Sequence, residues 1–251
     1  MTSASAETVA CVGSSTTAAK GTYRWIAELE GRPRNGRFRF LNFGVGGDLS
    51  FHTIRRLRRV SASRPDRVIV LIGTNDILAS VFPNFRRVVR VWKGLPAEPS
   101  APRFEETLAL ITRRLRHETG ARIALSSLAP VGEDPHSRHV VQARLNDEFA
   151  AYTDAIRAVA SREGTDYIGF FEAFQDQLVR ADTAKPFTRF SFPSFYRDYL
   201  IREAVLRRSF DEISRMNGWE FHIDGIHLNT RGGRILTEAV QGFLDSPAGG
   251  N

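Results

Sequence analysis

The chain has 251 residues, of which 42% are hydrophobic and 25% charged, a composition typical of a globular protein with a sizeable buried core. It has one cysteine, Cys11, no apolar run as long as a membrane span and no recognisable secretory signal, so we expect a cytoplasmic protein without a disulfide framework or a cysteine-based metal site. The formal net charge is +7, but the arginines are spread along the chain without a known nucleic-acid-binding pattern, so we expect no nucleic-acid partner.

Predicted strands and helices alternate along the chain. Apolar runs with β-branched residues predict strands, and apolar residues that recur every three or four positions predict amphipathic helices. Up to Gly120 the order is a strand over 7–13, a helix over 20–31, a strand over 38–44, a helix over 49–62, a strand over 66–73, and a helix with the apolar face Phe104, Leu108, Ile111 and Leu115. A strand over 121–130, a long helix over 140–164, a weaker strand over 165–171 and a final helix over 230–244 follow.

This alternation predicts a mostly parallel sheet of about five strands with helices on both faces. The run 66–73 is continuously apolar, as expected for a strand that is buried on both faces. We therefore expect a single α/β domain over residues 1–251. Two segments, 78–102 and 185–218, fit the alternation poorly and are predicted insertions.

The 185–218 segment is rich in Phe, Tyr and Arg. Apolar residues in its second half, Tyr199, Leu206, Phe210 and Ile213, share a rough helical face. A basic amphipathic helix of this kind can cover an active site or touch an anionic lipid surface, and packing on the protein's own core is the simpler alternative. Because the segment leads into the loop before the last helix, we expect it to form part of a substrate-binding wall, with Phe195 as a candidate contact.

Four loops carry the residues that are suited to chemistry. In parallel sheets ligands bind beyond the carboxyl ends of the strands, where such loops gather. Ser14 and Ser15 follow the first strand, Gly44, Gly46 and Gly47 the second and Asn75 the third, and Asp224 and His227 precede the last helix. A nucleophilic serine needs a base, an acid that orients the base, and hydrogen-bond donors for the oxyanion. Together the loops supply each of these groups.

These motifs resemble the SGNH hydrolases, the superfamily of GDSL esterases and lipases. The first motif of that family is Gly-Asp-Ser, and here it is Gly13-Ser14-Ser15. The second is matched by "GVGGDLS" with Gly47, the third by "GTND" with Asn75, and the last by "DGIH" with Asp224 and His227. All four occur in the expected order and together span most of the chain.

The resemblance implies a three-layer α/β/α sandwich of the flavodoxin-like type and a serine esterase or lipase that acts on a small-molecule ester without a cofactor or metal. It implies that Ser15 is the nucleophile, His227 the base and Asp224 the acid. The oxyanion would be held by the backbone amides of Ser15 and Gly47 and by the side chain of Asn75. Ser14 stands where the family often has aspartate, and we regard Ser14 and His222 as further candidate substrate-binding residues.

Other functions remain open from the sequence. A carbohydrate O-acetyl esterase or an acyltransferase could use the same fold and the same residues. A non-catalytic binding module is the alternative of another class. Competing enzyme motifs are absent: "GSSTT" lacks the second glycine of a nucleophile elbow, and no Gly-Lys-Ser/Thr phosphate-binding loop occurs. The oligomeric state is not indicated.

Overall fold

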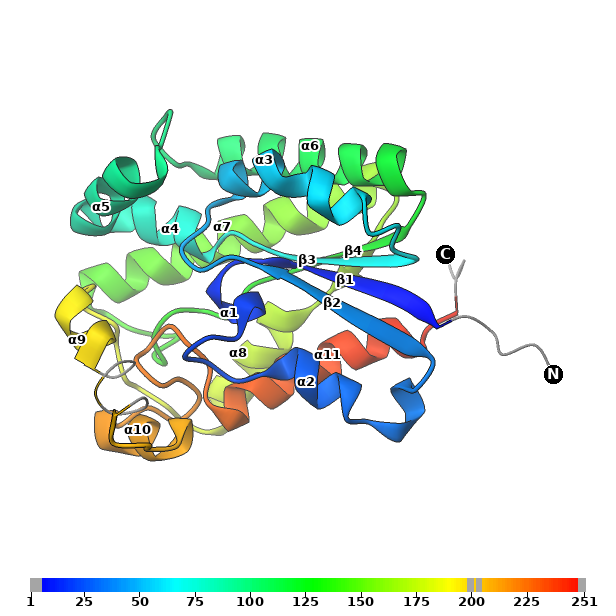
Figure 1. Ribbon diagram of the computed structural model, residues 1–251. Helices are drawn as coiled ribbons and strands as arrows, with labels where there is room; N and C mark the ends of the chain where they lie inside the picture. Colours follow the sequence, from blue (N-terminus) through cyan, green and yellow to red (C-terminus); the bar gives the residue numbers. More distant parts are fainter. Residues whose placement is uncertain (1–5, 198–200, 202–204, 248–251) are drawn as a thin grey trace.

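A parallel five-stranded sheet lies at the centre of the computed structural model, which describes residues 6–197, 201 and 205–247 (Figure 1). The strands are β1 (Glu7–Gly13), β2 (Phe38–Gly44), β3 (Arg67–Leu71), β4 (Arg122–Ser126) and β5 (Asp166–Ile168), in the spatial order β2-β1-β3-β4-β5. Every neighbouring pair runs parallel. This order is the flavodoxin-like one, and the predicted fold class is confirmed.

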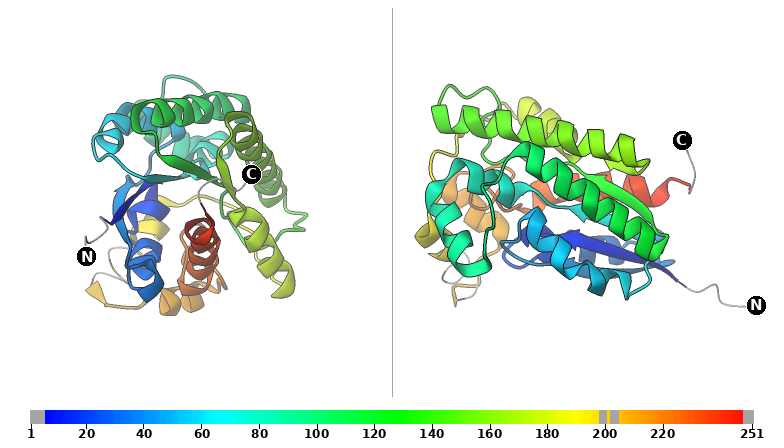
Figure 2. Two further views of the ribbon diagram at one scale, coloured as in Figure 1. Left: turned by 90° about the vertical axis from the view of Figure 1, so that its right-hand side faces the viewer. Right: turned by 90° about the horizontal axis from the view of Figure 1, so that it is seen from above.

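Helices cover both faces of the sheet, which makes the fold a three-layer sandwich (Figures 1 and 2). On one face lie α3 (Ser50–Ser61), α6 (Ala101–Thr119) and α7 (Val140–Glu163). On the other lie α2 (Trp25–Glu30), α8 (Phe170–Arg180) and α11 (Thr230–Asp245). None of the described helices is long and apolar enough to cross a membrane.

The apolar runs form the core between these layers. Val9 to Val12 of β1 have no exposed surface, and the five residues of β3 are all buried. Because helices pack on both sides of these strands, side chains of both orientations are buried, which explains the absence of polar alternation. The long helix α7 buries Leu145, Phe149, Tyr152 and Ile156, the apolar face expected from the sequence.

The strand predicted over 165–171 is shorter in the structure, and its predicted C-terminal boundary was wrong. β5 ends at Ile168, and α8 begins at Phe170, a helix that the sequence reading missed. Phe170, Phe174 and Leu178 recur every four residues and are buried against the core. Helical periodicity thus overrides the strand propensity of the two adjacent phenylalanines.

The segments predicted as insertions lie at one end of the sheet. Residues 78–102 include the end of α4 (Thr74–Val81) and all of α5 (Pro83–Lys93), and residues 185–218 include α9 (Phe192–Tyr196) and α10 (Phe210–Asn217). The remaining short elements are α1 (Ser15–Ala18) and a 3₁₀ turn, Pro33–Asn35. In Figure 1 the two segments lie on the left, where the strands end.

The residues of the predicted helical face between Phe195 and Met216 do not form one continuous helix. Residues 207–209 are not helical and separate α10 from the preceding turn, and Arg207 has the left-handed φ of 50°. Leu206 is 58% exposed whereas Ile213 is 1% exposed, so these two residues do not share a face. Tyr199 lies outside the described residues.

Candidate active site

Ser15 follows β1 at the point where the sheet order reverses. It is the first residue of α1, two residues beyond Gly13 at the strand end. A Cβ on Gly13 would lie 2.1 Å from Thr17 Oγ1 and 2.4 Å from the carbonyl oxygen of Leu71, so the tight turn requires glycine there. β1 and β3 are neighbours in the sheet, and their connections leave in opposite directions. Doubly wound sheets bind ligands at such a point, beyond the carboxyl ends of the strands.

The loop before α11 brings a histidine and a carboxylate to Ser15. His227 Nε2 lies 3.2 Å from Ser15 Oγ, and His227 Nδ1 lies 2.8 Å from Asp224 Oδ2. The other carboxylate oxygen, Oδ1, accepts the backbone N–H groups of Ile226 at 2.9 Å and His227 at 2.8 Å. Since an ionised carboxylate only accepts hydrogen bonds, Nδ1 carries the hydrogen and Nε2 of the neutral ring can accept the serine hydroxyl.

The electrostatics of this pair suit a base that becomes charged during reaction. Burial alone would raise the pKa of Asp224, but the charge and hydrogen bonds of His227 and the backbone N–H of Ile226 lower it to about 2. Burial alone would lower the pKa of His227, but the charge and hydrogen bond of Asp224 outweigh it and raise that pKa above its ordinary value. Asp224 therefore stabilises a protonated His227.

The loop after β2 places Gly47 beside the serine. Gly47 has a φ of 73°, a left-handed conformation that favours glycine. The side chain of Asn75, from the first turn of α4, donates through Nδ2 to the carbonyl oxygen of Asp48 at 2.9 Å and retains a second hydrogen on that nitrogen. Ser15, Gly47, Asn75 and His227 line one cleft, so the structure brings these predicted residues together.

Three charged residues that the sequence reading did not single out hold the Gly47 loop. Asp48 is buried and forms ion pairs with Lys93 of α5 at 2.6 Å and with Arg56 of α3 at 2.8 Å. Lys93 Nζ also donates to the carbonyl oxygen of Gly46 at 2.7 Å. Arg56 donates to the carbonyl oxygens of Gly13, at 2.8 Å, and Phe43. One guanidinium thus connects the loops that follow β1 and β2.

Asp76 fixes the same region from the side of β3. Its carboxylate accepts the backbone N–H of Ser50 at 3.0 Å and the Ser50 hydroxyl at 2.6 Å. Burial raises the pKa of Asp76 to about 6, although the hydrogen bonds from Ser50 oppose the shift. The hydrogen bonds of the Asp76 carboxylate go to the start of α3 and not to Ser15, so Asp76 supports the loop before α3.

The cleft has a volume of about 320 Å³ and a mostly apolar wall. Ser15, His227, Gly47 and Asn75 lie at its polar end. The rest of its lining is largely hydrophobic, and comes from α4, α5 and the 185–196 region: Leu78, Phe85, Val88, Val89, Trp92, Phe190 and Phe192.

An aromatic cluster joins the two segments that form this wall. The ring of Phe85 on α5 lies 4.8 Å from that of Phe190 and 6.1 Å from that of Phe192, centroid to centroid. Phe190 and Phe192 are 4.7 Å apart and edge to face. Such pairs add to the stability that burial alone gives, so the wall is a packed structure and not a loose loop.

The other candidate substrate contacts do not reach this cleft. Ser14 is buried with 4% exposure, and His222 has no exposed surface. His222 Nδ1 lies 2.9 Å from Glu133 Oε1 and Nε2 lies 3.1 Å from the carbonyl oxygen of Pro130, so its ring is fully engaged behind the loop. Neither residue lines the cleft, and a role of Ser14 or His222 in substrate binding stays a prediction. Phe195 belongs to α9, but its side chain lies outside the described residues.

Fold and site first define a class of protein: a flavodoxin-like α/β/α sandwich with a serine, a histidine and an aspartate in hydrogen-bonded series at the carboxyl ends of its strands. The family follows from comparison with known proteins. The model of the GDSL-like lipase/acylhydrolase family matches residues 11–235, and the chain belongs to this family. The predicted resemblance is confirmed, and the chain is an ester hydrolase by family.

Solved structures with the same fold are distant in sequence. The acetyl xylan esterase AlAXEase is 18% identical, with 94% of this chain and 99% of that chain covered and a TM-score of 0.65. Axe2, an acetylxylan esterase from Geobacillus stearothermophilus, is 15% identical, with 98% of both chains covered and a TM-score of 0.64. LAE5, a hydrolase from the metagenome of Lake Arreo in Spain, is 20% identical, with 97% and 99% covered and a TM-score of 0.63. Comparison with curated protein sequences finds no match.

Proposed function

We propose that the protein hydrolyses carboxylic esters through an acyl-enzyme on Ser15. The observation that carries this proposal is the hydrogen-bonded series from Ser15 Oγ through His227 to Asp224, with 3.2 Å and 2.8 Å between the paired atoms. His227 Nε2 takes the hydroxyl proton while Oγ attacks the ester carbonyl carbon. The protonated His227 then gives this proton to the leaving alcohol oxygen as its bond to the acyl carbon breaks.

Water then hydrolyses the acyl-enzyme, with water in place of the serine as nucleophile and the serine in place of the alcohol as leaving group. His227 takes a proton from water, the resulting hydroxide attacks the acyl carbon, and the serine oxygen leaves with the proton from His227. The negative charge on the carbonyl oxygen is stabilised in both halves by the backbone N–H groups of Ser15 and Gly47 and by Asn75 Nδ2. Fixed donors of this kind are effective because they need no reorganisation as the charge develops.

The cleft supports an acyl group with some hydrophobic length. Its apolar wall begins beside the serine and includes Phe85, Phe190 and Phe192. Burying methylene groups there contributes roughly 0.8 kcal/mol for each CH₂. A short to medium acyl chain fits a cleft of about 320 Å³.

A carbohydrate O-acetyl esterase is the second candidate. It is favoured by two solved structures with this fold, AlAXEase and Axe2, which are acetylxylan esterases. The apolar wall favours longer chains than acetyl, so acyl-chain preference separates the two candidates. Transfer of the acyl group to an added alcohol would identify an acyltransferase, which uses the same serine.

The first experiment is hydrolysis of p-nitrophenyl esters from acetate to laurate, and of acetylated xylan, by the wild type and the Ser15→Ala variant. We expect wild-type activity with a preference for chains longer than acetyl and its loss in the variant. A fluorophosphonate probe should label the wild type only. Wild-type protein that neither cleaves an ester nor reacts with the probe would refute the proposal and favour a binding module.

The aromatic wall has a separate test. Phe190→Ala should weaken the preference for longer acyl chains while acetate hydrolysis stays close to that of the wild type, because only the longer chains reach this ring. A matched control is Phe51→Ala, which changes a half-buried phenylalanine on α3 outside this cleft. An unchanged chain-length profile in Phe190→Ala would count against the wall.

A further inference from the structure

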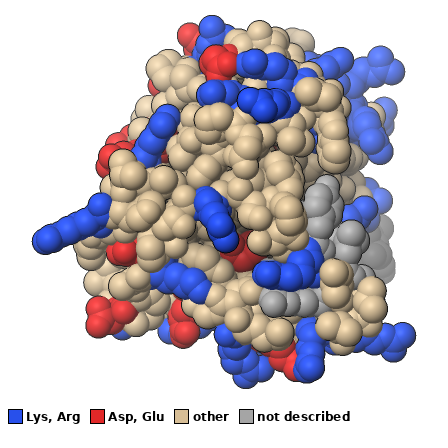
Figure 3. Space-filling model, turned by 90° about the vertical axis from the view of Figure 1, so that its left-hand side faces the viewer, with Lys and Arg blue, Asp and Glu red and all other residues tan. Residues whose placement is uncertain are grey.

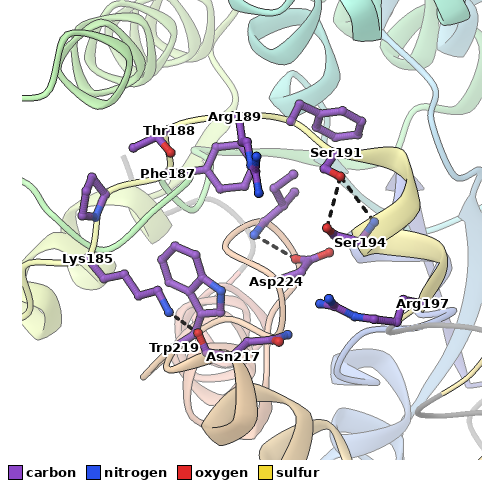
Figure 4. A pocket seen from close by; sticks show the side chains of 13 residues that line it. Lys185, Phe187, Thr188, Arg189, Ser191, Ser194, Arg197, Asn217, Trp219 and Asp224 are labelled. Carbon is purple, nitrogen blue, oxygen red and sulfur yellow. Dashed lines mark hydrogen bonds between the residues drawn. The ribbon is translucent and has the colours of Figure 1, made fainter.

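A second cavity adjoins the catalytic cleft on the side of the histidine loop (Figure 4). It has a volume of about 350 Å³ and shares Phe190 and Ile226 with the cleft. Segment 185–197 and the loop from Asn217 to Ile226 form its walls. We call it the cationic pocket, after the three basic residues in its lining: Lys185, Arg189 and Arg197.

The described lining of the cationic pocket has more basic than acidic side chains. Asp224 is the one carboxylate in the described lining, and its oxygens are already engaged by His227 and two backbone amides. The described lining thus holds three basic side chains and one carboxylate. Figure 3 shows that Lys and Arg are also spread over this whole end of the molecule.

The three cations differ in how they are held. Lys185 donates to the carbonyl oxygen of Asn217, and its Nζ lies 4.3 Å from the ring centroid of Trp219, so it is fixed within the wall. Burial lowers the pKa of Lys185, and the charge of nearby Glu133 partly opposes that shift. The side chain of Arg189 forms no ion pair with the described carboxylates, and Figure 4 shows it and Arg197 at the edge of the same cavity.

The position of the cationic pocket relates it to the alcohol half of an ester. His227 must deliver its proton to the oxygen of the leaving alcohol, so that alcohol lies on the histidine side of the scissile bond. The cationic pocket is lined by Asp224 and Ile226 of that same loop. The apolar cleft is lined by Gly47 and Asn75 and also by Ile226 and His227, so the two cavities meet at the histidine loop. The two cavities thus divide an ester into an acyl half and an alcohol half.

We propose that the cationic pocket binds an anionic group, a phosphate or a carboxylate, on the alcohol half of the ester substrate. This inference rests on the proposed function of the cleft and names the substrate class for it. Arginine matches the geometry of both anions because its planar fork can donate two parallel hydrogen bonds. Ser194 Oγ donates to Ser191 Oγ at 3.1 Å, which leaves the hydrogen of the Ser191 hydroxyl as a further donor in the pocket. A neutral sugar or glycerol would offer no negative charge to Arg189, which forms no ion pair with the described carboxylates.

The test compares esters that share one acyl group and differ only in the charge of the alcohol. The substrates are the butyryl esters of glycerol, glycerol 3-phosphate and glyceric acid. We expect the wild type to have at least tenfold higher kcat/KM for one or both anionic esters than for the glycerol ester, mainly through KM. The phosphate and carboxylate arms show which anion the pocket prefers. The preference should shrink as salt is added, because a partly exposed site is screened.

Arg189→Gln is the main variant and Arg197→Gln the second. Either should lower kcat/KM about tenfold for the preferred anionic ester, equivalent to about 1.4 kcal/mol, and leave the glycerol ester unchanged. The matched control is Arg59→Gln, which removes the same charge from an exposed position on α3. Equal rates for neutral and anionic esters, or equal losses in the control variant, would overturn the proposal.

A binding measurement separates this inference from the proposed function. Glycerol 3-phosphate and glycerol are titrated into the wild type and Arg189→Gln by calorimetry, which needs no turnover. Binding of the phosphate alone, weakened in the variant, supports the pocket even if no ester is cleaved. Absence of phosphate binding by the wild type overturns the pocket even if neutral esters are cleaved.

Discussion

Lys93 lies on α5 and is not one of the residues Ser15, His227 and Asp224, yet we predict that its removal lowers kcat. It makes two contacts to the loop that carries Gly47, at 2.7 Å to Gly46 and 2.6 Å to Asp48. Lys93→Met keeps the length of the side chain and removes both contacts. The backbone N–H of Gly47 then loses one of the restraints that aim it at the oxyanion.

The size of the effect follows from these contacts. Hydrogen bonds to charged groups contribute about 1.5–3 kcal/mol each, and the lower end applies here because Lys93 is 28% exposed. Asp48 keeps its contacts with Arg56 and Asn75, so part of the restraint remains. We expect a loss of about 1–2 kcal/mol of transition-state stabilisation, or roughly 5–30-fold in kcat. Loss of an entire oxyanion donor, about 10²–10³, is the upper limit.

The assay is hydrolysis of p-nitrophenyl acetate, whose short acyl group does not reach the far wall of the cleft. KM should change little, because the restraint matters most when charge develops on the carbonyl oxygen. Lys93→Arg should recover most of kcat. Arg87→Met, an exposed charge on the same helix, is the control for changes in α5 itself. A folded Lys93→Met protein with kcat within twofold of the wild type would refute the reasoning.

Three further predictions concern the catalytic residues and a buried support. Asn75→Ala should lose about 10²–10³ in kcat, and near-normal turnover on p-nitrophenyl acetate would exclude it as an oxyanion donor. Because Asp224 raises the pKa of His227 and the base must be neutral, kcat/KM should rise with pH through a value above 6.5. Asp224→Asn should move this rise to lower pH and lower kcat about 10³–10⁴-fold. A pH profile that does not move in this variant would contradict the pairing of Asp224 with His227. Glu133→Gln should lose about 3 kcal/mol of unfolding free energy, measured in urea, because the buried carboxylate accepts three backbone N–H groups and the ring of His222; an unchanged midpoint would refute this.

Much of the fold could be predicted because its signals are local. After Arg67, β3 is a short, continuously apolar run, and α7 repeats its apolar residues every three or four positions over 24 residues. The order of strands and helices then leaves few topologies open. The site residues Ser15, Asn75 and His227 could be chosen for the same reason, since each follows a strand or precedes a helix at a position that the topology brings to one edge.

Residues whose role depends on distant partners could not be predicted. Arg56 stands in the run "IRRLRR", where no local feature separates it from its neighbours, yet it contacts loops 8 to 43 residues away. Glu133 accepts hydrogen bonds from residues 87 to 89 positions later in the chain. His222 was expected near substrate because it lies two residues before Asp224, but its buried ring is hydrogen-bonded to Glu133 and to the carbonyl oxygen of Pro130.

The helical face predicted within 185–218 does not form, but the segment does lie beside the catalytic cleft. A helical pattern drawn through Leu206 and Ile213 ignored the turn at 207–209, and the argument for lipid contact through that helix loses its basis; contact with anionic lipid stays a prediction. The segment nevertheless contributes Phe190 and Phe192 to the catalytic cleft. Its aromatic composition was informative, because rings that are buried together need a partner surface, and α5 supplies it.

The structure connects substrate recognition to the oxyanion loop through α5. This helix presents Phe85 and Val89 to the cleft on one side and ends in Lys93, which holds the Gly47 loop. An acyl chain that packs against α5 stabilises the same helix that positions Lys93, so part of its binding energy can be expressed in the transition state. The rate advantage of longer acyl chains should therefore appear in kcat as well as in KM, and Lys93→Met should reduce the kcat part of that advantage while it leaves the KM part in place.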